Sequence, residues 1–252
     1  MIFFVHGSHH DAGYWTGMQA EFSRRGFESR ALDLGSSRWA TVASLVRRLR
    51  DEIHDESDGG ADAVYVGHSQ GALVVQSHLA TGGRARAAIL MAPVPLDTLL
   101  WLRHSRSLAT SVPPANLVAS ALTLNSKYVV APDVETMRAN FFLPTTKSTT
   151  RSEFGNSLEE YFLHEITPED TVVGSLFSRG NARDISVPTL LVAAEQDKLV
   201  GVDTVVALGR LIPNAAEVCV VSEQAHAFSD PGWEDSVCGP METFLRSTAG
   251  VP

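Results

Sequence analysis

The sequence is poor in cysteine and in basic residues, and both shortages narrow the kinds of protein it can be. Only two cysteines, Cys219 and Cys238, occur in 252 residues. They are too few for a disulfide framework or a cysteine-rich zinc site, so we expect free thiols. Acidic residues outnumber basic ones by 29 to 20, and the formal net charge is −9. Since no basic run offsets this balance, a nucleic-acid-binding surface is not expected.

Long hydrophobic runs are also missing. The apolar start, residues 1–5, has no basic residues before it and is followed directly by His6-Gly7. This is not the pattern of a secretion signal. No stretch reaches the roughly 18 continuous apolar residues of a membrane span. The nearest stretch, 87–104, is interrupted by two prolines and by Asp97. We therefore expect a cytoplasmic protein without a membrane span.

Short apolar runs alternate with helix-length amphipathic segments along most of the chain. The apolar runs predict six strands, at 2–5, 27–34, 63–67, 86–93, 188–197 and 216–222. The amphipathic segments predict helices at 14–25, 39–56, 72–80, 204–212 and 232–247, the last disturbed in its middle by Gly239-Pro240. Because the strands are continuously apolar, this α/β pattern predicts a mainly parallel sheet covered on both faces, with its ligand site at the carboxyl ends of the strands.

One long segment, residues 95–181, breaks the alternation. It is rich in leucine and aromatic residues and lies between two predicted core strands. We therefore expect a helical cap inserted into a core formed by 1–94 and 182–252. Most of the cap's aromatic side chains should form the cap's own interior, and a few should line the substrate pocket. The candidates for the pocket, together with His6 from the core, are Trp101, Phe141, Phe142 and Tyr161.

The stretch "GHSQG", residues 67–71, lies between a predicted strand and a predicted helix. A serine between two glycines on such a sharp turn can point its hydroxyl into a cleft, and the small neighbours let the helix and strands pack closely. The alternative is a tight turn that happens to carry a serine. The placement after "AVYV" and before "ALVVQSHLA" favours Ser69 as a nucleophile.

A serine hydroxyl is a weak nucleophile until a base takes its proton, so Ser69 needs partners. Asp197 follows the fifth predicted strand and His226 follows the sixth, which is the order expected when the serine lies on a strand-to-helix turn. The alternative readings are a helix-capping carboxylate for Asp197 and a surface residue for His226. Glu195 is a second acid in the same loop, ranked below Asp197.

A tetrahedral intermediate also needs two N–H donors for its oxyanion. We expect one from the backbone of Gln70, directly after the serine, and one from the backbone of Ser8, with its hydroxyl as a further donor. His6 should brace this loop rather than act on substrate. Adjacent histidines such as His9 and His10 face different ways and lack an acidic partner at ligand spacing, so no metal site is expected.

Four stretches together resemble the α/β-hydrolase superfamily: "VHGSHHDAGYW", "GHSQG", "AAEQDKLV" and "QAHAFSDP". The loop running from His-Gly to an aromatic pair is similar to the branch that contains plant methylesterases and hydroxynitrile lyases. So, more loosely, is "YFLHEITPED". The resemblance implies a Ser69, Asp197 and His226 triad, an oxyanion hole at Ser8 and Gln70, a helical cap and no cofactor. It also implies about six strands, without the antiparallel hairpin that many members have first.

Two departures restrict the chemistry that the resemblance implies. Hydroxynitrile lyases of this branch have a lysine beside the catalytic histidine, whereas His226 is flanked by Ala225 and Ala227. Epoxide hydrolases and haloalkane dehalogenases of this fold use an aspartate nucleophile, whereas this chain has Ser69. We therefore expect a serine hydrolase that cleaves esters of apolar small molecules.

Several alternatives use the same pocket. A thioesterase or a C–C bond hydrolase would need the same triad, a tailoring enzyme could catalyse elimination or cyclisation, and a non-hydrolytic receptor could keep the triad unused. The expected partner is a small apolar ester-like molecule, and a homodimer remains open.

Overall fold

A computed structural model describes most of the expected core and little of the expected cap. The described residues are 1–8, 10–35, 41–54, 60–97, 100, 103–104, 113, 115, 134–144, 180–248 and 250. Trp101 and Tyr161, two of the predicted pocket residues, lie outside them, as does His9. The boundaries of the cap therefore stay a prediction.

The core is a six-stranded sheet in the order β2-β1-β3-β4-β5-β6, and every pairing between neighbours is parallel. The strands are β1 (Ile2–Val5), β2 (Ser29–Leu32), β3 (Val64–His68), β4 (Ala87–Met91), β5 (Thr189–Ala194) and β6 (Cys219–Val221). The four inner strands are buried along their whole length. This confirms the prediction of a mainly parallel sheet of about six strands.

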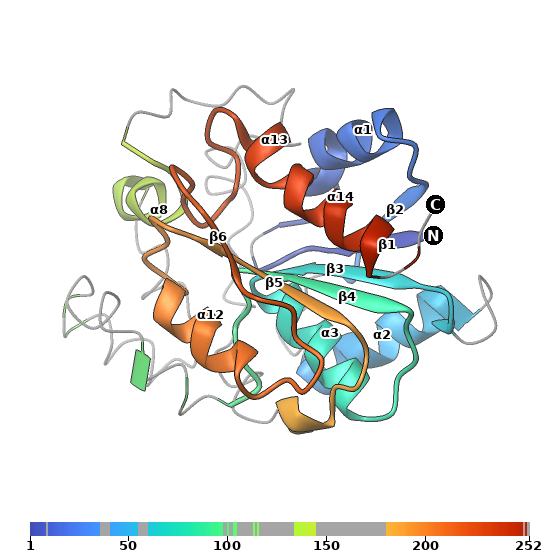
Figure 1. The fold of residues 1–252 in the computed structure, drawn as a ribbon. Helices are drawn as coiled ribbons and strands as arrows, with labels where there is room; N and C mark the ends of the chain where they lie inside the picture. Colours follow the sequence, from blue (N-terminus) through green and yellow to red (C-terminus); the bar gives the residue numbers. More distant parts are fainter. Residues whose placement is uncertain are drawn as a thin grey trace.

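Helices cover both faces of the sheet (Figure 1). The helical elements are η1 (Ala12–Trp15), α1 (Thr16–Arg24), α2 (Val42–His54), α3 (Gln70–Ala80), α8 (Val134–Phe141), η3 (Ala182–Asp184), α12 (Val202–Gly209), α13 (Trp233–Ser236) and α14 (Cys238–Ser247). Figure 1 shows α1 and α14 together on one face, with α2, α3 and α12 on the other. None of the helices in the described part of the chain has the length and apolar character needed to cross a membrane.

The pattern that predicted α2 also explains how it packs. Its apolar residues recur at helical spacing and all are buried: Val42, Leu45, Val46, Leu49 and Ile53. Charged side chains occupy the positions between them, so one stripe of the helix faces the sheet and the rest faces solvent. The packing of α2 against α3 follows from this stripe.

The last helical segment differs from its prediction in one detail. The break lies at Val237, where α13 ends and α14 begins, and not at Gly239-Pro240. Pro240 lies in the first turn of α14. A proline is tolerated there because the first N–H groups of a helix have no partner within the helix. Cys238, at the start of α14, is buried, and Cys219 is half-buried; both are free thiols, as predicted.

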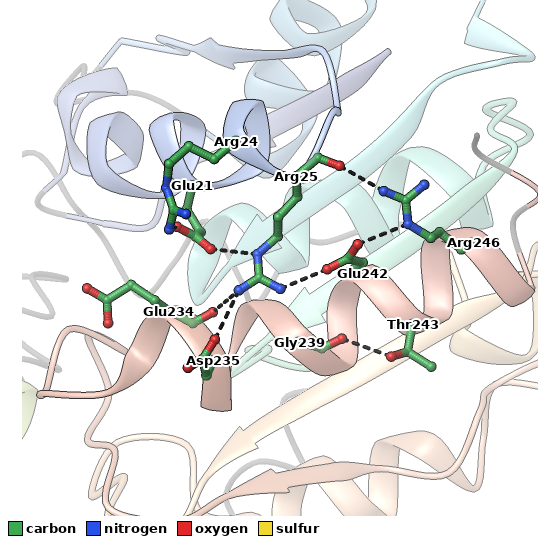
Figure 2. Close-up of polar contacts among 9 residues, drawn as sticks. All are labelled: Glu21, Arg24, Arg25, Glu234, Asp235, Gly239, Glu242, Thr243 and Arg246. Carbon is green, nitrogen blue, oxygen red and sulfur yellow. Dashed lines mark hydrogen bonds and ion pairs between the residues drawn. The ribbon is translucent and has the colours of Figure 1, made fainter.

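A charge network joins α1 to the C-terminal helices, with Arg25 at its centre (Figure 2). Glu21 is buried, with 5% of its side chain exposed, and it binds both Arg25 and the exposed Arg24. Arg246 completes the network by donating to the Arg25 carbonyl oxygen. The guanidinium of Arg25 donates to Glu21, Glu242, the Glu234 carbonyl oxygen and Asp235. These partners, Glu242 first, raise the pKa of Arg25, so its charge is permanent.

Replacing Arg25 with methionine should destabilise the fold much more than the same change at Arg24. Arg25→Met leaves the buried Glu21 carboxylate with a single, exposed partner and removes the link to α14. Breaking such a network costs about 3 kcal/mol, whereas an exposed pair contributes at most about 1 kcal/mol. For a chain of this size, thermal unfolding should show a loss of roughly 6–12 °C for Arg25→Met. Equal shifts for the two variants would show that the network contributes little.

Candidate active site

Ser69 lies on a strained turn between β3 and α3. Its backbone angles are φ 52° and ψ −116°, a region that residues other than glycine rarely adopt. Its N–H donates to the Met91 carbonyl oxygen of β4 at 2.9 Å. The residue is only partly buried. The turn therefore has the geometry that the GHSQG motif predicted.

The glycines of the motif are required by close packing. A β-carbon on Gly67 would lie 2.6 Å from the Cα atom of Ala72, and one on Gly71 would overlap the carbonyl oxygens of Val5 and His6. Neither position has room for a side chain. Both glycines thus allow α3 to begin directly against the strands, which fixes the corner that carries the serine.

Three side chains from the ends of different strands form a hydrogen-bonded chain. The Nε2 atom of His226 lies 3.1 Å from the Oγ atom of Ser69, and its Nδ1 atom lies 2.7 Å from the Oδ2 atom of Asp197. Since a carboxylate only accepts, Nδ1 carries the proton and Nε2 is free to accept the proton of the hydroxyl. The structure thus brings together the three residues that the sequence singled out.

Asp197 is oriented by the backbone that follows it. Its second oxygen, Oδ1, accepts from the N–H groups of Leu199 at 2.7 Å and Val200 at 2.9 Å. The side chains of Asp197 and His226 are both essentially inaccessible to solvent. Glu195, the other candidate acid, is exposed and instead accepts from the N–H of Glu223. The geometry therefore favours Asp197 as the partner of His226.

The loop after β1 lies beside the serine. A β-carbon on Gly7 would be 3.0 Å from the Cβ atom of Ser69. The Ser8 hydroxyl donates to the side-chain oxygen of Gln70 at 2.8 Å, which joins this loop to the start of α3. The first backbone N–H groups of a helix lack partners within the helix, and the N–H of Gln70 is the first of α3. Both residues expected at an oxyanion hole are thus neighbours of Ser69.

His6 and His10 contact protein groups around this loop. The Nε2 atom of His6 lies 3.6 Å from an oxygen of Asp33, at the end of β2, and the His6 ring lowers the pKa of that carboxyl to about 2. The Nδ1 atom of His10 lies 2.9 Å from the Ser8 carbonyl oxygen. These contacts fit the bracing role expected of His6. Among the described residues, no group of three or more histidines, cysteines or acids could hold a metal ion.

Phe141, at the end of α8, is a pocket candidate whose ring contacts His226. Its ring centre lies 5.2 Å from that of His226, edge to face, and its carbonyl oxygen accepts from the Ala227 N–H. Phe142 is half-buried and packs against the core. Both residues belong to the segment expected to be the cap. The described end of that segment thus contacts the histidine loop.

Sequence reasoning missed the residues that hold the loop of His226. Tyr14, His68 and Asp230 all donate to or accept from its backbone. His68 lies inside the GHSQG motif, but nothing in the motif predicts that its ring contacts the backbone of a residue 158 positions later in the chain. Asp230 has no local pattern that distinguishes it from a surface acid, although it is fully buried.

Comparisons with known proteins show the sequence family and the fold. The sequence model of the alpha/beta hydrolase family matches residues 2–232. No curated protein sequence matches the chain. Among solved structures, a bromoperoxidase from Bacillus anthracis is similar with a TM-score of 0.68 and 13% identity, over 98% of this chain and 91% of that one.

Two further solved structures are similar over 98% of this chain. The esterase RhEst1 from Rhodococcus sp. ECU1013 has a TM-score of 0.64 and 17% identity over 90% of its own chain. An epoxide hydrolase from Bacillus megaterium has a TM-score of 0.63 and 17% identity over 93% of its own chain. At such identities these likenesses concern the fold alone. Because the family match spans nearly the whole sequence, the protein belongs to the α/β-hydrolase family.

Proposed function

We propose that the protein is a serine hydrolase that cleaves carboxylic esters of apolar small molecules through an acyl-enzyme on Ser69. The observation that carries this proposal is the continuous chain of hydrogen bonds from Asp197 through His226 to Ser69. Such a chain raises the nucleophilicity of a serine because the imidazole takes its proton as the bond to carbon forms.

In the first half of the reaction, the Ser69 oxygen attacks the ester carbonyl carbon and its proton passes to Nε2 of His226. The carbonyl electron pair moves to the oxygen, where the backbone N–H groups of Ser8 and Gln70 stabilise the charge. When the intermediate collapses, the C–O bond breaks and the leaving alcohol takes the proton from Nε2. Asp197 holds the imidazole in the required tautomer and stabilises the imidazolium.

In the second half, water attacks the acyl-enzyme carbonyl and gives its proton to His226. The tetrahedral intermediate collapses, the acid leaves, and Ser69 recovers its proton from Nε2. Each step moves one proton between His226 and an oxygen. The proposed cycle uses these residues, the ester and water.

The apolar character of the substrate rests on the segment 95–181, which we propose to be a cap over the site. It is rich in leucine and aromatic residues, and its described end brings Phe141 against His226. Esterases are among the proteins of similar fold. An epoxide hydrolase is also among them, but the aspartate nucleophile of such enzymes is replaced here by Ser69.

Tyr14-Trp15 after His6-Gly7 supports membership of the plant methylesterase-like branch.

The test is covalent labelling combined with an ester panel. A fluorophosphonate should add one mass equivalent to the protein, and peptide mapping should find it on Ser69. The kcat/KM for turnover of p-nitrophenyl esters should then rise from acetate to longer or ring-containing acyl groups, because a larger apolar group buries more surface at about 25 cal/mol per Å².

The two measurements separate the two parts of the proposal. A mapped label on another serine, or no label, contradicts the nucleophile. A labelled Ser69 with equal turnover of short and bulky esters contradicts the apolar substrate while leaving the serine chemistry intact.

A further inference from the structure

His68 is a fully buried histidine directly before the nucleophile, and it takes no part in the proton transfers described above. Burial, followed by the neighbouring His226 and His10, moves its pKa well below the ordinary value. The ring is therefore neutral at physiological pH, and one of its two nitrogens carries a proton.

The surroundings of the ring determine which nitrogen this is. The Nε2 atom of His68 lies 2.8 Å from the backbone carbonyl oxygen of His226. A carbonyl oxygen only accepts, so Nε2 is the protonated nitrogen. The Nδ1 atom faces Gly7, where a β-carbon would lie 3.1 Å away, and it has no hydrogen-bond partner within the described structure. The ring is thus held in the tautomer that donates to His226.

Tyr14 makes the equivalent contact with the next residue. Its hydroxyl donates to the Ala227 carbonyl oxygen at 2.8 Å, and its ring stacks on that of His68 at 5.0 Å between centres. Burial raises the pKa of Tyr14, so its hydroxyl stays protonated and can only donate here. Consecutive carbonyls of the histidine loop are therefore held by two stacked, neutral donors.

The loop needs to be held because it is strained. Phe228 has a positive φ of 49°, which is unfavourable for a bulky residue, and its N–H closes a turn onto the Ala225 carbonyl oxygen at 3.0 Å. Such a conformation persists only where surrounding contacts determine it. His68 and Tyr14 supply two such contacts, on the peptides that join His226 to Ala227 and Ala227 to Phe228.

We propose that His68 and Tyr14 are positioning residues that hold the backbone of the His226 loop so that Nε2 stays within reach of the Ser69 hydroxyl. The proposal rests on the proposed serine chemistry, since it assigns these two side chains to the same triad. A displacement of about 1 Å in such a site costs roughly 100-fold in rate. A purely structural role would instead lower stability without changing the rate of the folded protein.

The experiment removes each donor while keeping the shape of the side chain. Tyr14→Phe deletes only the hydroxyl and His68→Leu deletes the ring N–H, whereas His68→Gln keeps an N–H near the position of Nε2. The matched control is Tyr65→Phe, because the buried hydroxyl of Tyr65 has no partner in the described structure. All variants are compared with the wild-type protein at a temperature at which each is folded.

Two readouts are measured on each variant. The first readout is kinetic. It comprises the rate of fluorophosphonate labelling together with kcat and KM for a p-nitrophenyl ester. We expect kcat and the labelling rate to fall about 10-fold for Tyr14→Phe and about 100-fold for His68→Leu, with KM nearly unchanged. His68→Gln should recover most of the loss, and Tyr65→Phe should behave as wild type.

The second readout needs no substrate: the downfield proton resonance of the His226 Nδ1–H bonded to Asp197. It should shift or broaden in Tyr14→Phe and His68→Leu, and it should be unchanged in Tyr65→Phe. Unchanged rates and resonance in folded Tyr14→Phe and His68→Leu would overturn the proposal. Equal losses in Tyr14→Phe and Tyr65→Phe would do the same. If His68→Leu does not fold, the rates and the proton resonance of Tyr14→Phe and His68→Gln test the proposal instead.

The proposed function fails in a different way. A wild-type protein that neither takes the phosphonate nor cleaves any ester contradicts the serine chemistry. The proton resonance still reports whether His68 and Tyr14 hold the histidine loop.

Discussion

Replacing Ser69 with alanine is expected to lower kcat for ester hydrolysis by about 10⁶-fold, as removal of the nucleophile does in serine proteases. Alanine removes the only atom that forms the acyl-enzyme, and His226 cannot compensate because its Nε2 atom then has no hydroxyl to deprotonate. The oxyanion donors and the binding pocket remain, so a residual rate above that in water should persist. The measurement is steady-state turnover of the best ester from the panel.

The control for this substitution is Ser247→Ala, which removes an exposed hydroxyl that donates to the Thr243 carbonyl oxygen within α14 and lies 3.4 Å from the Thr248 hydroxyl oxygen. It should retain wild-type turnover and an unchanged melting temperature. Turnover of Ser69→Ala within 10-fold of wild type would mean that the bond is cleaved by another group, and the acyl-enzyme proposal would then be wrong.

Asp197→Asn should lower kcat by about 10⁴-fold while leaving the fold intact. Asparagine matches the size of aspartate but can donate from its amide, so it can stabilise the imidazole tautomer that has its proton on Nε2. In that tautomer, Nε2 cannot accept from Ser69. The loss of the carboxylate charge also removes its stabilisation of the imidazolium. Turnover and phosphonate labelling should fall together.

Glu195→Gln provides the comparison from the same loop. Its side chain is exposed and accepts a long hydrogen bond, of 3.4 Å, from the Glu223 N–H. Turnover should stay within a few-fold of wild type. If Glu195→Gln proved the more damaging of the two, the assignment of the triad acid would be reversed.

The sheet could be predicted from the sequence because each strand carries its own signal. The run "IFFV" is continuously apolar, and β1 covers these four residues, Ile2–Val5. The same holds for α2, where the spacing of the apolar residues matches the buried face. The break at Val237 was missed because the sequence signal for a break, Gly239-Pro240, is equally compatible with the first turn of a helix.

The three residues of the proposed triad could be singled out from the sequence because they follow strands whose carboxyl ends meet at one edge of the sheet. Ser69, Asp197 and His226 needed only the order of the strands and the chemistry of each side chain. Tyr14 and His68 could not be found in this way, because their role depends on the position of backbone carbonyls in a loop far along the chain. No residue spacing predicts such a contact, because it depends on the three-dimensional conformation of the loop.

The long sequence separations within the triad bear on how the protein is made. Ser69 and its histidine are 157 residues apart, and the carboxylate and histidine are 29 apart. Ser69 therefore leaves the ribosome long before the residues proposed to activate it, and chains begin to fold from their N-terminal part during synthesis. Under the proposed mechanism, Ser69 is an ordinary alcohol until β6 and the loop after it are added. Nascent and truncated chains are thus expected to carry no activated nucleophile that could react with cellular esters.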